Sequence, residues 1–395
     1  MSVPKLRFEE FSGEWESTTL SKSCIMNPKS SKLPSNFIYI DLESVANGKL
    51  LKENYINILD APSRAQRLLW NNDILYQTVR PYQKNNYFFK GQNNMVVAST
   101  GYAQLRCDTN IPQYVYQYIH NDVFVSNVML RCTGTSYPAI NSTDLGSVKV
   151  SLPTLQEQQK IAEFLSAFDE KIENQQNIIK NLEQQKKGFM QKIFSQELRF
   201  KDQNGNDFPQ WEEKKLGEIC EMIGGGTPSK QVEEFWTGNI PWISSSDISD
   251  YSIKNIAISR YITHNAISKS ATKLCPKGTI CIVSRVGVGK LAVTNEELCT
   301  SQDFTNITRF EGNILFLAYL LSMRMKMEAE KTQGTSIKGI TVSEIKSFLL
   351  FLPSLSEQQK IADFLSAFDE KIQTEKQILI HLQNTKKGLL QQMFC

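Results

Sequence analysis

Apolar residues recur at alternating spacings of four and three positions in two stretches of the chain. The first stretch carries Ile161, Leu165, Phe168, Ile172, Ile179, Leu182, Phe189 and Ile193. The second carries Ile361, Leu365, Phe368, Ile372, Leu379, Leu382, Leu389 and Met393. This spacing aligns the apolar side chains of each stretch along one stripe of an α-helix, as in the seam of a coiled coil. We therefore predict two long helices, each of about 40 residues and about 60 Å in length.

The two stretches are also copies of one another. LPTLQEQQKIAEFLSAFDEKI begins at Leu152, and LPSLSEQQKIADFLSAFDEKI begins 200 residues later at Leu352. Residues off the seam recur as well, which packing of the seam alone does not require: Glu157, Gln158, Gln159, Lys160, Ser166, Asp169, Glu170 and Lys171. Either this outer face meets the same kind of partner in both copies or the duplication is recent, and the sequence leaves both readings open.

Each copy carries signals for the start of its helix and for its pairing. A hydroxyl residue three positions before a glutamate, at Thr154 and at Ser354, predicts a capping box. Polar residues interrupt the two seams at matching places and would fix the register of a coiled coil; they are Gln175 with Glu375 and Lys186 with Lys386. We predict that the helices pair with each other in antiparallel fashion, which would return Cys395 to the side of Met1 and place two different heads at opposite ends of a rod.

The duplication divides the chain into four segments. A Leu-Arg-Phe tripeptide with a Trp soon after begins at Leu6 and again at Leu198, so each repeat combines a variable region with a helix. The predicted segments are 1–151 (first variable domain), 152–197 (first helical region), 198–351 (second variable domain) and 352–395 (second helical region). Short β-rich runs at 94–98 and 279–283 indicate that the variable domains mix strands with helices.

Composition and charge narrow the class of protein only slightly. With 395 residues, 41% of them hydrophobic, the chain is globular and long enough for two domains of about 150 residues plus the helices. Eight cysteines without a Cys-x-x-Cys pair and only three histidines make a zinc site or a disulfide framework unexpected. We find neither a signal segment nor an apolar stretch that could cross a bilayer, so we expect a cytoplasmic protein with reduced thiols.

Motifs for catalysis are absent from the sequence. GVGKL from Gly287 and GGGTPSK from Gly224 lack the full glycine and GK[ST] pattern of a phosphate-binding loop. An NPPY-like adenine-methyltransferase motif is absent too. An enzyme of either class needs these parts, so we expect a non-catalytic chain.

The sequence resembles, over essentially its whole length, the specificity (S) subunit of type I restriction-modification systems. The resemblance lies in the repeated LPxLxEQ segments and in FIYIDLESVANGKL, NDILYQTVRPYQKN, VASTGYAQLR and GTSYPAIN of the first variable region. In the second it lies in GGGTPSK, GNIPWISSSDI, LCPKGTICIVSRVGVGK and TSQDF. It implies an α+β fold in which two globular target recognition domains are separated by two long antiparallel coiled-coil helices, with an internal pseudo-twofold repeat.

The resemblance also implies partners. Such a subunit reads a bipartite, asymmetric site in double-stranded DNA, one half-site per variable domain, and docks two methyltransferase (M) subunits. ATP-driven restriction (R) subunits join that complex. S-adenosylmethionine, ATP and Mg²⁺ would be used by the other subunits, with no cofactor bound by this chain. The net charge of only +3 then indicates that phosphate contacts are local or shared with partners. A specificity subunit of a methylation-only or non-translocating system, or a scaffold presenting two heads to proteins, stays open as an alternative.

Polar loops of the variable regions supply the candidates for DNA binding. Arg suits guanine and Gln suits adenine in the major groove, whereas Lys and hydroxyl groups suit phosphates. The candidates in the first region are Gln77, Thr78, Arg80, Tyr82, Lys84, Ser99, Thr100 and Tyr102. Those in the second are Thr227, Ser229, Lys230, Ser244, Ser245, Ser246, Ser284, Arg285, Lys290 and Gln302. The glycine run at 224–226 would let backbone amides approach a phosphate, or would simply form a tight turn.

Overall fold

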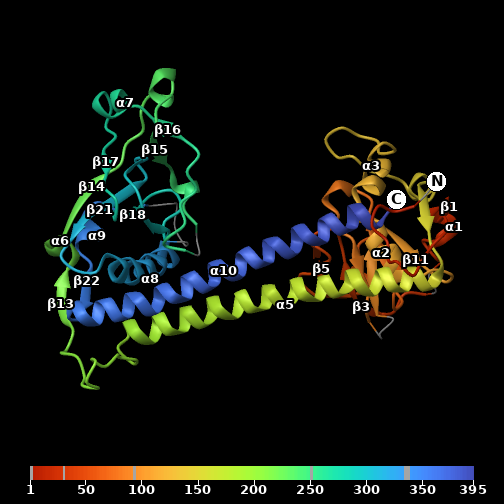
Figure 1. Cartoon of the computed structure of the whole chain (residues 1–395), viewed down its shortest axis with the longest axis horizontal. Helices are drawn as coiled ribbons and strands as arrows, with labels where there is room; N and C mark the ends of the chain where they lie inside the picture. Colours follow the sequence, from red (N-terminus) through yellow and green to blue (C-terminus); the bar gives the residue numbers. More distant parts are fainter. Residues whose placement is uncertain (1–2, 30–31, 92–94, 250–251, 333–338) are drawn as a thin grey trace. The chain divides into compact units, whose positions relative to one another are not determined.

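The chain forms two compact units, each of which contains part of both long helices. The computed structural model describes residues 3–29, 32–91, 95–249, 252–332 and 339–395. Unit 1 comprises Met1–Asn177 with Gln377–Cys395, and unit 2 comprises Ile178–Lys376. Helices α5 (Leu155–Phe194) and α10 (Leu355–Met393) both run from one unit into the other (Figure 1). Each unit thus combines one variable domain with the start of one long helix and the end of the other, and the segment boundaries at 151, 197 and 351 stay predictions.

The two predicted long helices are confirmed, and their apolar stripes are buried as expected. The sixteen predicted seam residues are all buried or half-buried, whereas Ile178, Ile378 and Ile380, which lie off the seam, are exposed. In unit 2 the ring of Phe189 on α5 lies 5.2 Å from that of Phe364 on α10, measured between centroids. The regular spacing of apolar side chains therefore located the buried face of both helices.

The antiparallel pairing is also confirmed within each unit. In unit 1 the end of α10 returns to the N-terminal segment, where the Leu6 amide donates a hydrogen bond to the Gln392 carbonyl oxygen at 2.8 Å. The Tyr118 hydroxyl donates to the Cys395 carbonyl oxygen at 3.0 Å. Met1 itself lies outside the described residues, but the approach of the two ends of the chain is the one that antiparallel helices require.

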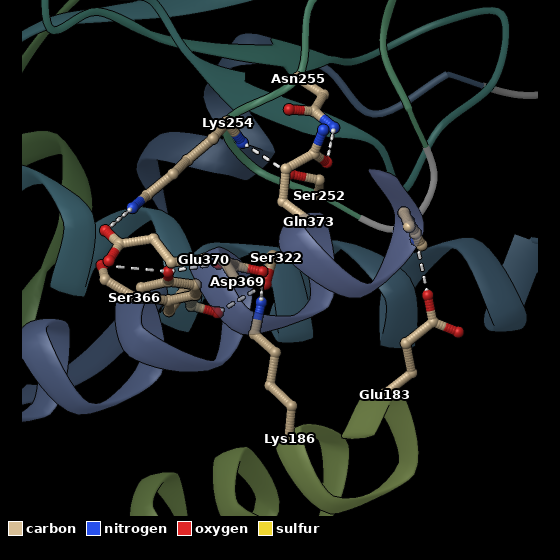
Figure 2. Close-up of polar contacts among 12 residues, drawn as sticks. Glu183, Lys186, Ser252, Lys254, Asn255, Ser322, Ser366, Asp369, Glu370 and Gln373 are labelled. Atoms are coloured by element: carbon tan, nitrogen blue, oxygen red, sulfur yellow. Dashed lines mark hydrogen bonds and ion pairs between the residues drawn. The ribbon is translucent and has the colours of Figure 1, made fainter. Parts of the chain in front are cut away.

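The lysines of the predicted polar layers each pair with an aspartate of the opposite helix. In unit 2 Lys186 Nζ of α5 lies 2.6 Å from Asp369 Oδ1 of α10, and Figure 2 shows the lysine pointing at that carboxylate. In unit 1 the roles of the helices are exchanged, and Lys386 Nζ lies 2.5 Å from Asp169 Oδ1. Because a shift of either helix by a turn would separate these charges, the two pairs help to fix the register.

The variable domains share one topology that their sequences do not reveal. In unit 1 one antiparallel sheet has the order β2-β11-β8-β9, and a second has the order β6-β3-β10-β7, in which β3 and β10 are parallel. In unit 2 the corresponding orders are β14-β21-β18-β19 and β16-β15-β20-β17, with β15 and β20 parallel. The duplication therefore includes both variable domains, and the mixed α+β class is confirmed.

The sheet strands correspond pairwise in order between the units, although their lengths differ. In unit 1 they are β2 (Ile25–Met26), β3 (Asn36–Ile40), β6 (Asn54–Asn57), β7 (Ala65–Leu68), β8 (Ile74–Gln77), β9 (Tyr87–Phe88), β10 (Val96–Ser99) and β11 (Tyr102–Arg106). In unit 2 they are β14 (Cys220–Gly224), β15 (Ile240–Ile243), β16 (Tyr261–Ile262), β17 (Leu274–Cys275), β18 (Ile280–Val283), β19 (Leu291–Val293), β20 (Leu298–Thr300) and β21 (Phe304–Phe310). Strands β10 and β18 confirm the two predicted β-rich runs, except that Asn94 of the first run lies outside the described residues.

A short two-stranded sheet leads into each long helix. Strand β1 (Glu16–Thr19) pairs with β12 (Lys149–Leu152), and β13 (Glu212–Lys215) pairs with β22 (Leu349–Leu352). The remaining elements are α1 (Leu20–Ser23), β4 (Val45–Ala46), β5 (Lys49–Leu50), η1 (Ile58–Asp60), η2 (Pro81–Gln83), α2 (Pro112–Tyr118), α3 (Asp122–Met129) and α4 (Ser142–Gly146) in unit 1. In unit 2 they are α6 (Leu216–Ile219), η3 (Glu233–Trp236), η4 (Ser245–Asp247), α7 (His264–Ser268), α8 (Ile314–Thr332) and α9 (Val342–Lys346).

The glutamate of each LPxLxEQ segment binds the N-terminal segment of its repeat, and we call Glu157 and Glu357 the carboxylate anchors. Glu157 accepts hydrogen bonds from Arg7 Nε at 2.8 Å and Arg7 Nη2 at 2.7 Å, and from Trp15 Nε1 at 3.3 Å. Glu357 is fully buried and accepts from the corresponding donors: Arg199 Nε at 3.1 Å, Arg199 Nη2 at 2.7 Å and Trp211 Nε1 at 3.1 Å.

These anchors correct two expectations. Only half of the first capping box forms, since the Glu157 amide donates to Thr154 Oγ1 at 3.3 Å but the carboxylate is taken by Arg7 and Trp15. In the second copy Ser354 Oγ has no hydrogen-bond partner within the described part of the chain. The outer-face interpretation was wrong for the glutamates and for the following glutamines, because Gln158 and Gln358 are buried and accept from the Ile111 and Asn313 amides.

The outer-face interpretation was also wrong for Ser366 and Asp369, which are buried in the second copy, whereas other repeated positions are exposed. Gln159, Glu170 and Lys171 are exposed in the first copy, as are their counterparts Gln359, Glu370 and Lys371.

None of the described helices is long and apolar enough to cross a membrane.

Candidate nucleic-acid interface

In unit 1 the end of strand β8 joins three loop segments through one hydroxyl residue. The Thr78 amide and Oγ1 both donate to the Gly101 carbonyl oxygen, at 3.1 and 2.7 Å. The Thr78 carbonyl oxygen accepts from the Ile140 amide at 3.0 Å. The loops that begin near residues 78, 99 and 134 are therefore held together at one point.

Unit 2 repeats this arrangement with a different sequence. The Ser284 amide and Oγ donate to the Asp303 carbonyl oxygen at 2.8 and 3.1 Å, and the Ser284 carbonyl oxygen accepts from the Ile340 amide at 2.7 Å. We call the two sets of bonds the hydroxyl framework, centred on Thr78 in unit 1 and on Ser284 in unit 2. The same three bonds in both units place corresponding loops in corresponding positions.

Five of the candidates are buried within their own domains: Gln77, Thr78, Ser99, Tyr102 and Ser284. Gln77 is only 4% exposed, and its amide already donates to Gln83 Oε1 at 2.8 Å and accepts from the Asn85 amide at 3.1 Å. These are the groups that reading an adenine would require, so in this conformation they are not available to a base. Contact with DNA stays a prediction for these five residues, and the interface proposed below uses the others.

The accessible candidates of unit 1 surround helix η2. Arg80 and Lys84 flank it, both with left-handed backbone (φ 55° each), and Tyr82 between them is half exposed. The Arg80 guanidinium lies over the ring of Tyr137, 4.2 Å from its centroid. Thr100 is half-buried in the adjoining loop, where its amide donates to the Arg64 carbonyl oxygen at 2.9 Å. No local sequence pattern predicts that an arginine 57 positions before Tyr137 stacks on its ring.

Lys84 is held by its own domain. Its Nζ donates to the His120 carbonyl oxygen at 2.8 Å and lies 2.6 Å from Asp122 Oδ1. A phosphate contact by this lysine would have to compete with both groups. The same segment also holds the imidazole of His120 through both ring nitrogens. Nδ1 donates to the Tyr116 carbonyl oxygen at 2.6 Å, and Nε2 accepts from Asn86 Nδ2 at 3.3 Å. That pattern fits the neutral ring.

Burial lowers the pKa of His120 to about 4 from an ordinary value of 6.5, although the Tyr116 carbonyl opposes the shift. Between these pH values the unfolded chain binds a proton that the folded chain does not, so the stability from His120 is lost as the pH falls from 6.5 toward 4. We expect the wild-type free energy of unfolding to fall between pH 7 and pH 4.5 by about 1–3 kcal/mol more than that of His120→Gln. Urea unfolding at both pH values measures this. His264→Gln, at an exposed position, should keep the wild-type pH dependence.

In unit 2 the candidates after the glycine run meet the loop after β20. Thr227 Oγ1 donates a hydrogen bond to Gln302 Oε1. A Cβ at Gly225 would overlap the Ser301 carbonyl oxygen, and one at Gly226 would lie 2.5 Å from the Ala271 carbonyl carbon. The glycines at 225 and 226 are therefore needed for close packing against the domain's own backbone, which favours the turn over a phosphate cradle.

Gly226→Ala should destabilise unit 2 by about 1–3 kcal/mol, because backbone atoms rather than a flexible side chain occupy the space of the new methyl group. Gly224→Ala is the matched control, since nothing lies within 4 Å of a Cβ there. The midpoint of urea unfolding compares the two variants. Equal midpoints would show that the loop relaxes without cost.

Arg260 is a contributor that the sequence did not reveal. Its Nη2 donates to Ser244 Oγ at 2.7 Å and to Asp247 Oδ2, and its guanidinium lies 4.7 Å from the ring centroid of Trp242. Asp247 and Ser244 also cap helix η4, so the candidates from Ser244 to Ser246 are organised by a distant arginine. Of the other candidates, Ser229, Lys230, Ser246, Arg285 and Gln302 are exposed, and Thr227, Ser244, Ser245 and Lys290 are half-buried.

Groups of three or more metal-binding side chains are not found within the described residues. The exposed arginines, lysines, hydroxyls and amides of both units are hydrogen-bond donors and acceptors of the kind that contact phosphates and base edges.

Comparison with known proteins shows which protein family this chain resembles. The model of the type I restriction modification DNA specificity domain matches residues 28–184 and again residues 209–384. The type I restriction enzyme MjaIX specificity subunit of Methanocaldococcus jannaschii is 36% identical over 188 residues, covering 46% of this chain and 44% of that protein. The EcoR124I/EcoR124II specificity subunit of Escherichia coli is 36% identical over 164 residues, covering 40% of each. The chain spans less than half the length of these two relatives.

Longer but weaker matches cover nearly the whole chain. The putative type I restriction enzyme MjaX specificity subunit of M. jannaschii is 24% identical over 366 residues, covering 88% of this chain and 84% of that protein. A solved structure from work on complex assembly and conformational transition of the type I R-M system has a TM-score of 0.61 at 21% identity, covering 96% of this chain and 97% of its own. The type I S subunit from M. genitalium has a TM-score of 0.57 at 17% identity, covering 99% of both chains. At these identities the structures support the fold alone.

Proposed function

Since the chain belongs to the type I restriction modification DNA specificity family, we propose that it selects the DNA sequence on which a type I complex acts, through two different half-sites. The observation that carries this proposal is the repeated hydroxyl framework. Thr78 and Ser284 make the same three bonds in the two units, yet the side chains on the adjoining loops differ. Two equivalent scaffolds with unlike surfaces suit the reading of a split, asymmetric site.

The recognition residues of this proposal are the accessible ones. In unit 1 they are Arg80, Tyr82, Lys84 and Thr100, and in unit 2 they are Thr227, Ser229, Lys230, Ser244, Ser245, Ser246, Arg285, Lys290 and Gln302. The modest net charge of +3 fits a chain that shares its phosphate contacts with other subunits.

The proposal extends to the partners of the complex. Two methyltransferase subunits would dock on the exposed residues shared by the two copies, Gln159, Glu170 and Lys171 with Gln359, Glu370 and Lys371. Identical faces in two places suit two identical partners. Restriction subunits would join through that complex, and S-adenosylmethionine, ATP and Mg²⁺ would be used by those subunits rather than by this chain.

A genome-wide map of adenine methylation, with the gene present and then deleted, tests the proposal. We expect methylation to be lost at one split, asymmetric motif on deletion. A chimera in which residues 16–150 come from a relative should change one half of the motif and leave the other unchanged. Loss of both halves in a folded chimera would contradict the assignment of one half-site to each unit, and an unchanged map on deletion would contradict the function.

A further inference from the structure

We propose that Arg80, supported by Tyr137, reads a guanine in the half-site bound by unit 1. This inference rests on the proposed function and assigns a base to one residue of the interface. Arginine donates two parallel hydrogen bonds to O6 and N7 of guanine in the major groove, provided that its guanidinium is presented in one orientation with free donors. Three features of Arg80 meet these conditions.

The backbone of Arg80 is fixed on both sides in a conformation that arginine rarely adopts. Its φ of 55° lies in the left-handed region. Its amide donates to the Pro138 carbonyl oxygen at 2.7 Å, and its carbonyl oxygen accepts from the Gln83 amide at 3.0 Å. A bridge between Val79 and Ala139 holds the preceding residue to the same segment. Such a conformation persists only where the surroundings impose it, and it is typical of residues that are positioned for binding.

The Arg80 guanidinium is supported on its face by an aromatic ring, and its Nη groups make no hydrogen bond to the described residues. It lies 4.2 Å from the centroid of the Tyr137 ring, whose residue is 66% exposed. No carboxylate among the described residues pairs with it. Its Nε is buried without a hydrogen-bond partner there, so the two Nη groups are the donors that a base could meet. Stacking on an aromatic ring therefore orients the donors without using them.

Arg106 in the same unit is also stacked on an aromatic ring, but it is paired with a carboxylate and provides a comparison for Arg80. Its guanidinium lies 5.0 Å from the ring centroid of Trp70, a stacked geometry much like that of Arg80. However, its Nε and Nη2 donate to the two oxygens of Asp73 at 2.8 and 2.7 Å. These bonds tie Arg106 to its own domain, whereas the two Nη groups of Arg80 make no hydrogen bond to the described residues.

Unit 2 presents a different side chain from the corresponding place. Arg80 lies two residues after Thr78 of the hydroxyl framework. The residue two positions after Ser284 is Val286, which is 63% exposed. The residue that would correspond to Tyr137 is Ile337, which lies outside the described residues. A shared framework that carries arginine in one unit and valine in the other is what different half-sites require.

Mapping adenine methylation in a host that carries the complete complex tests the assignment. The variants are Arg80→Lys, which keeps the charge but loses the fork of donors, and Arg80→Asn, which tolerates the left-handed backbone. The chimera described above identifies the half-site of unit 1. We expect that half-site to contain a guanine which both variants relax, with discrimination against other bases at that position reduced about tenfold or more. The other half-site should not change.

The controls separate this inference from the proposed function. Arg64→Ala, at an exposed arginine of the same unit, should leave the motif unchanged, whereas Tyr137→Ala should relax the same guanine and Tyr137→Phe should not. A wild-type complex that methylates a split motif while Arg80→Lys retains full selectivity would indicate a phosphate contact and overturn the inference alone. So would a unit 1 half-site without guanine. A wild-type complex without sequence-dependent methylation would overturn the proposed function, and this inference with it.

Discussion

Glu357→Ala should lower the free energy of unfolding of unit 2 by about 3–5 kcal/mol, because it leaves a partly buried arginine without its charged partner. The side chain of Arg199 is 21% exposed, and both of its bonds to the carboxylate would be lost along with the one from Trp211. The hydrogen bond to Glu357 raises the pKa of Arg199, so this side chain stays charged. Truncating the carboxylate therefore leaves the indole N–H without an acceptor and leaves the cation, among the described residues, with only the Phe208 and Pro209 carbonyl oxygens and no counter-charge.

Urea unfolding followed by circular dichroism measures the loss, and two variants calibrate it. Asp363→Ala removes an exposed carboxylate from the same helix and should change the free energy by less than about 0.5 kcal/mol. Glu157→Ala removes the equivalent anchor from unit 1, where Arg7 and Trp15 lose the same bonds. A loss below about 1 kcal/mol for Glu357→Ala would mean that water replaces the carboxylate, and the anchor would then not explain why this glutamate recurs.

Asp369→Ala should also lower the free energy of unfolding of unit 2 by about 3–5 kcal/mol, because two donors converge on this buried carboxylate. Lys186 Nζ lies 2.6 Å from Oδ1, and the Tyr319 hydroxyl donates to Oδ2 at 2.5 Å (Figure 2 shows the lysine and the aspartate). The side chains of Lys186 and Asp369 are 11% and 7% exposed. Removing the aspartate leaves a buried ammonium group over the Tyr319 ring with no counter-charge.

The pH dependence of this loss has a definite sign. Burial lowers the pKa of Lys186 and Asp369 opposes that shift, so without Asp369 the pKa should fall further below the ordinary value of 10.5. The folded Asp369→Ala protein then binds fewer protons than the unfolded chain, and its stability should rise as the pH approaches 10.5. Comparing urea unfolding at pH 7 and pH 10 measures this recovery. A loss that is equal or larger at pH 10 would contradict an uncompensated ammonium group as its cause.

Unit 1 contains the matched control. Asp169 pairs with Lys386 at 2.5 Å, but its side chain is 46% exposed, and Gln117 Nε2 also donates to it at 2.7 Å. Because solvent screens this pair, Asp169→Ala should cost about 1 kcal/mol or less. The double variant Lys186→Met with Asp369→Leu should recover most of the loss from Asp369→Ala, since apolar side chains of similar volume avoid the desolvation of a buried pair.

The candidate interface was only partly predictable. Residue type and loop position selected Tyr82, which is half exposed, and Arg80, which is half-buried, where polar side chains interrupt a strand-forming sequence. The same reasoning also selected Gln77, which is buried and bonded to its own loop. A polar side chain looks the same in sequence whether it faces water or completes an internal network. Which of these it does depends on segments many residues away.

The sequence by itself determined the two long helices, their buried stripes, their antiparallel pairing and the places of the lysine layers at Lys186 and Lys386. These features follow from the regular spacing of apolar and polar residues along each stretch and from its repetition in two copies, so they can be predicted without knowledge of distant contacts. Only the tertiary structure decided that the two variable domains share one strand order, because strand order depends on buried pairing that many sequences satisfy. It also decided that Glu157 and Glu357 bind Arg7 and Arg199 instead of closing capping boxes. A carboxylate takes the strongest donors within reach, and here the fold brings a guanidinium from about 150 residues away.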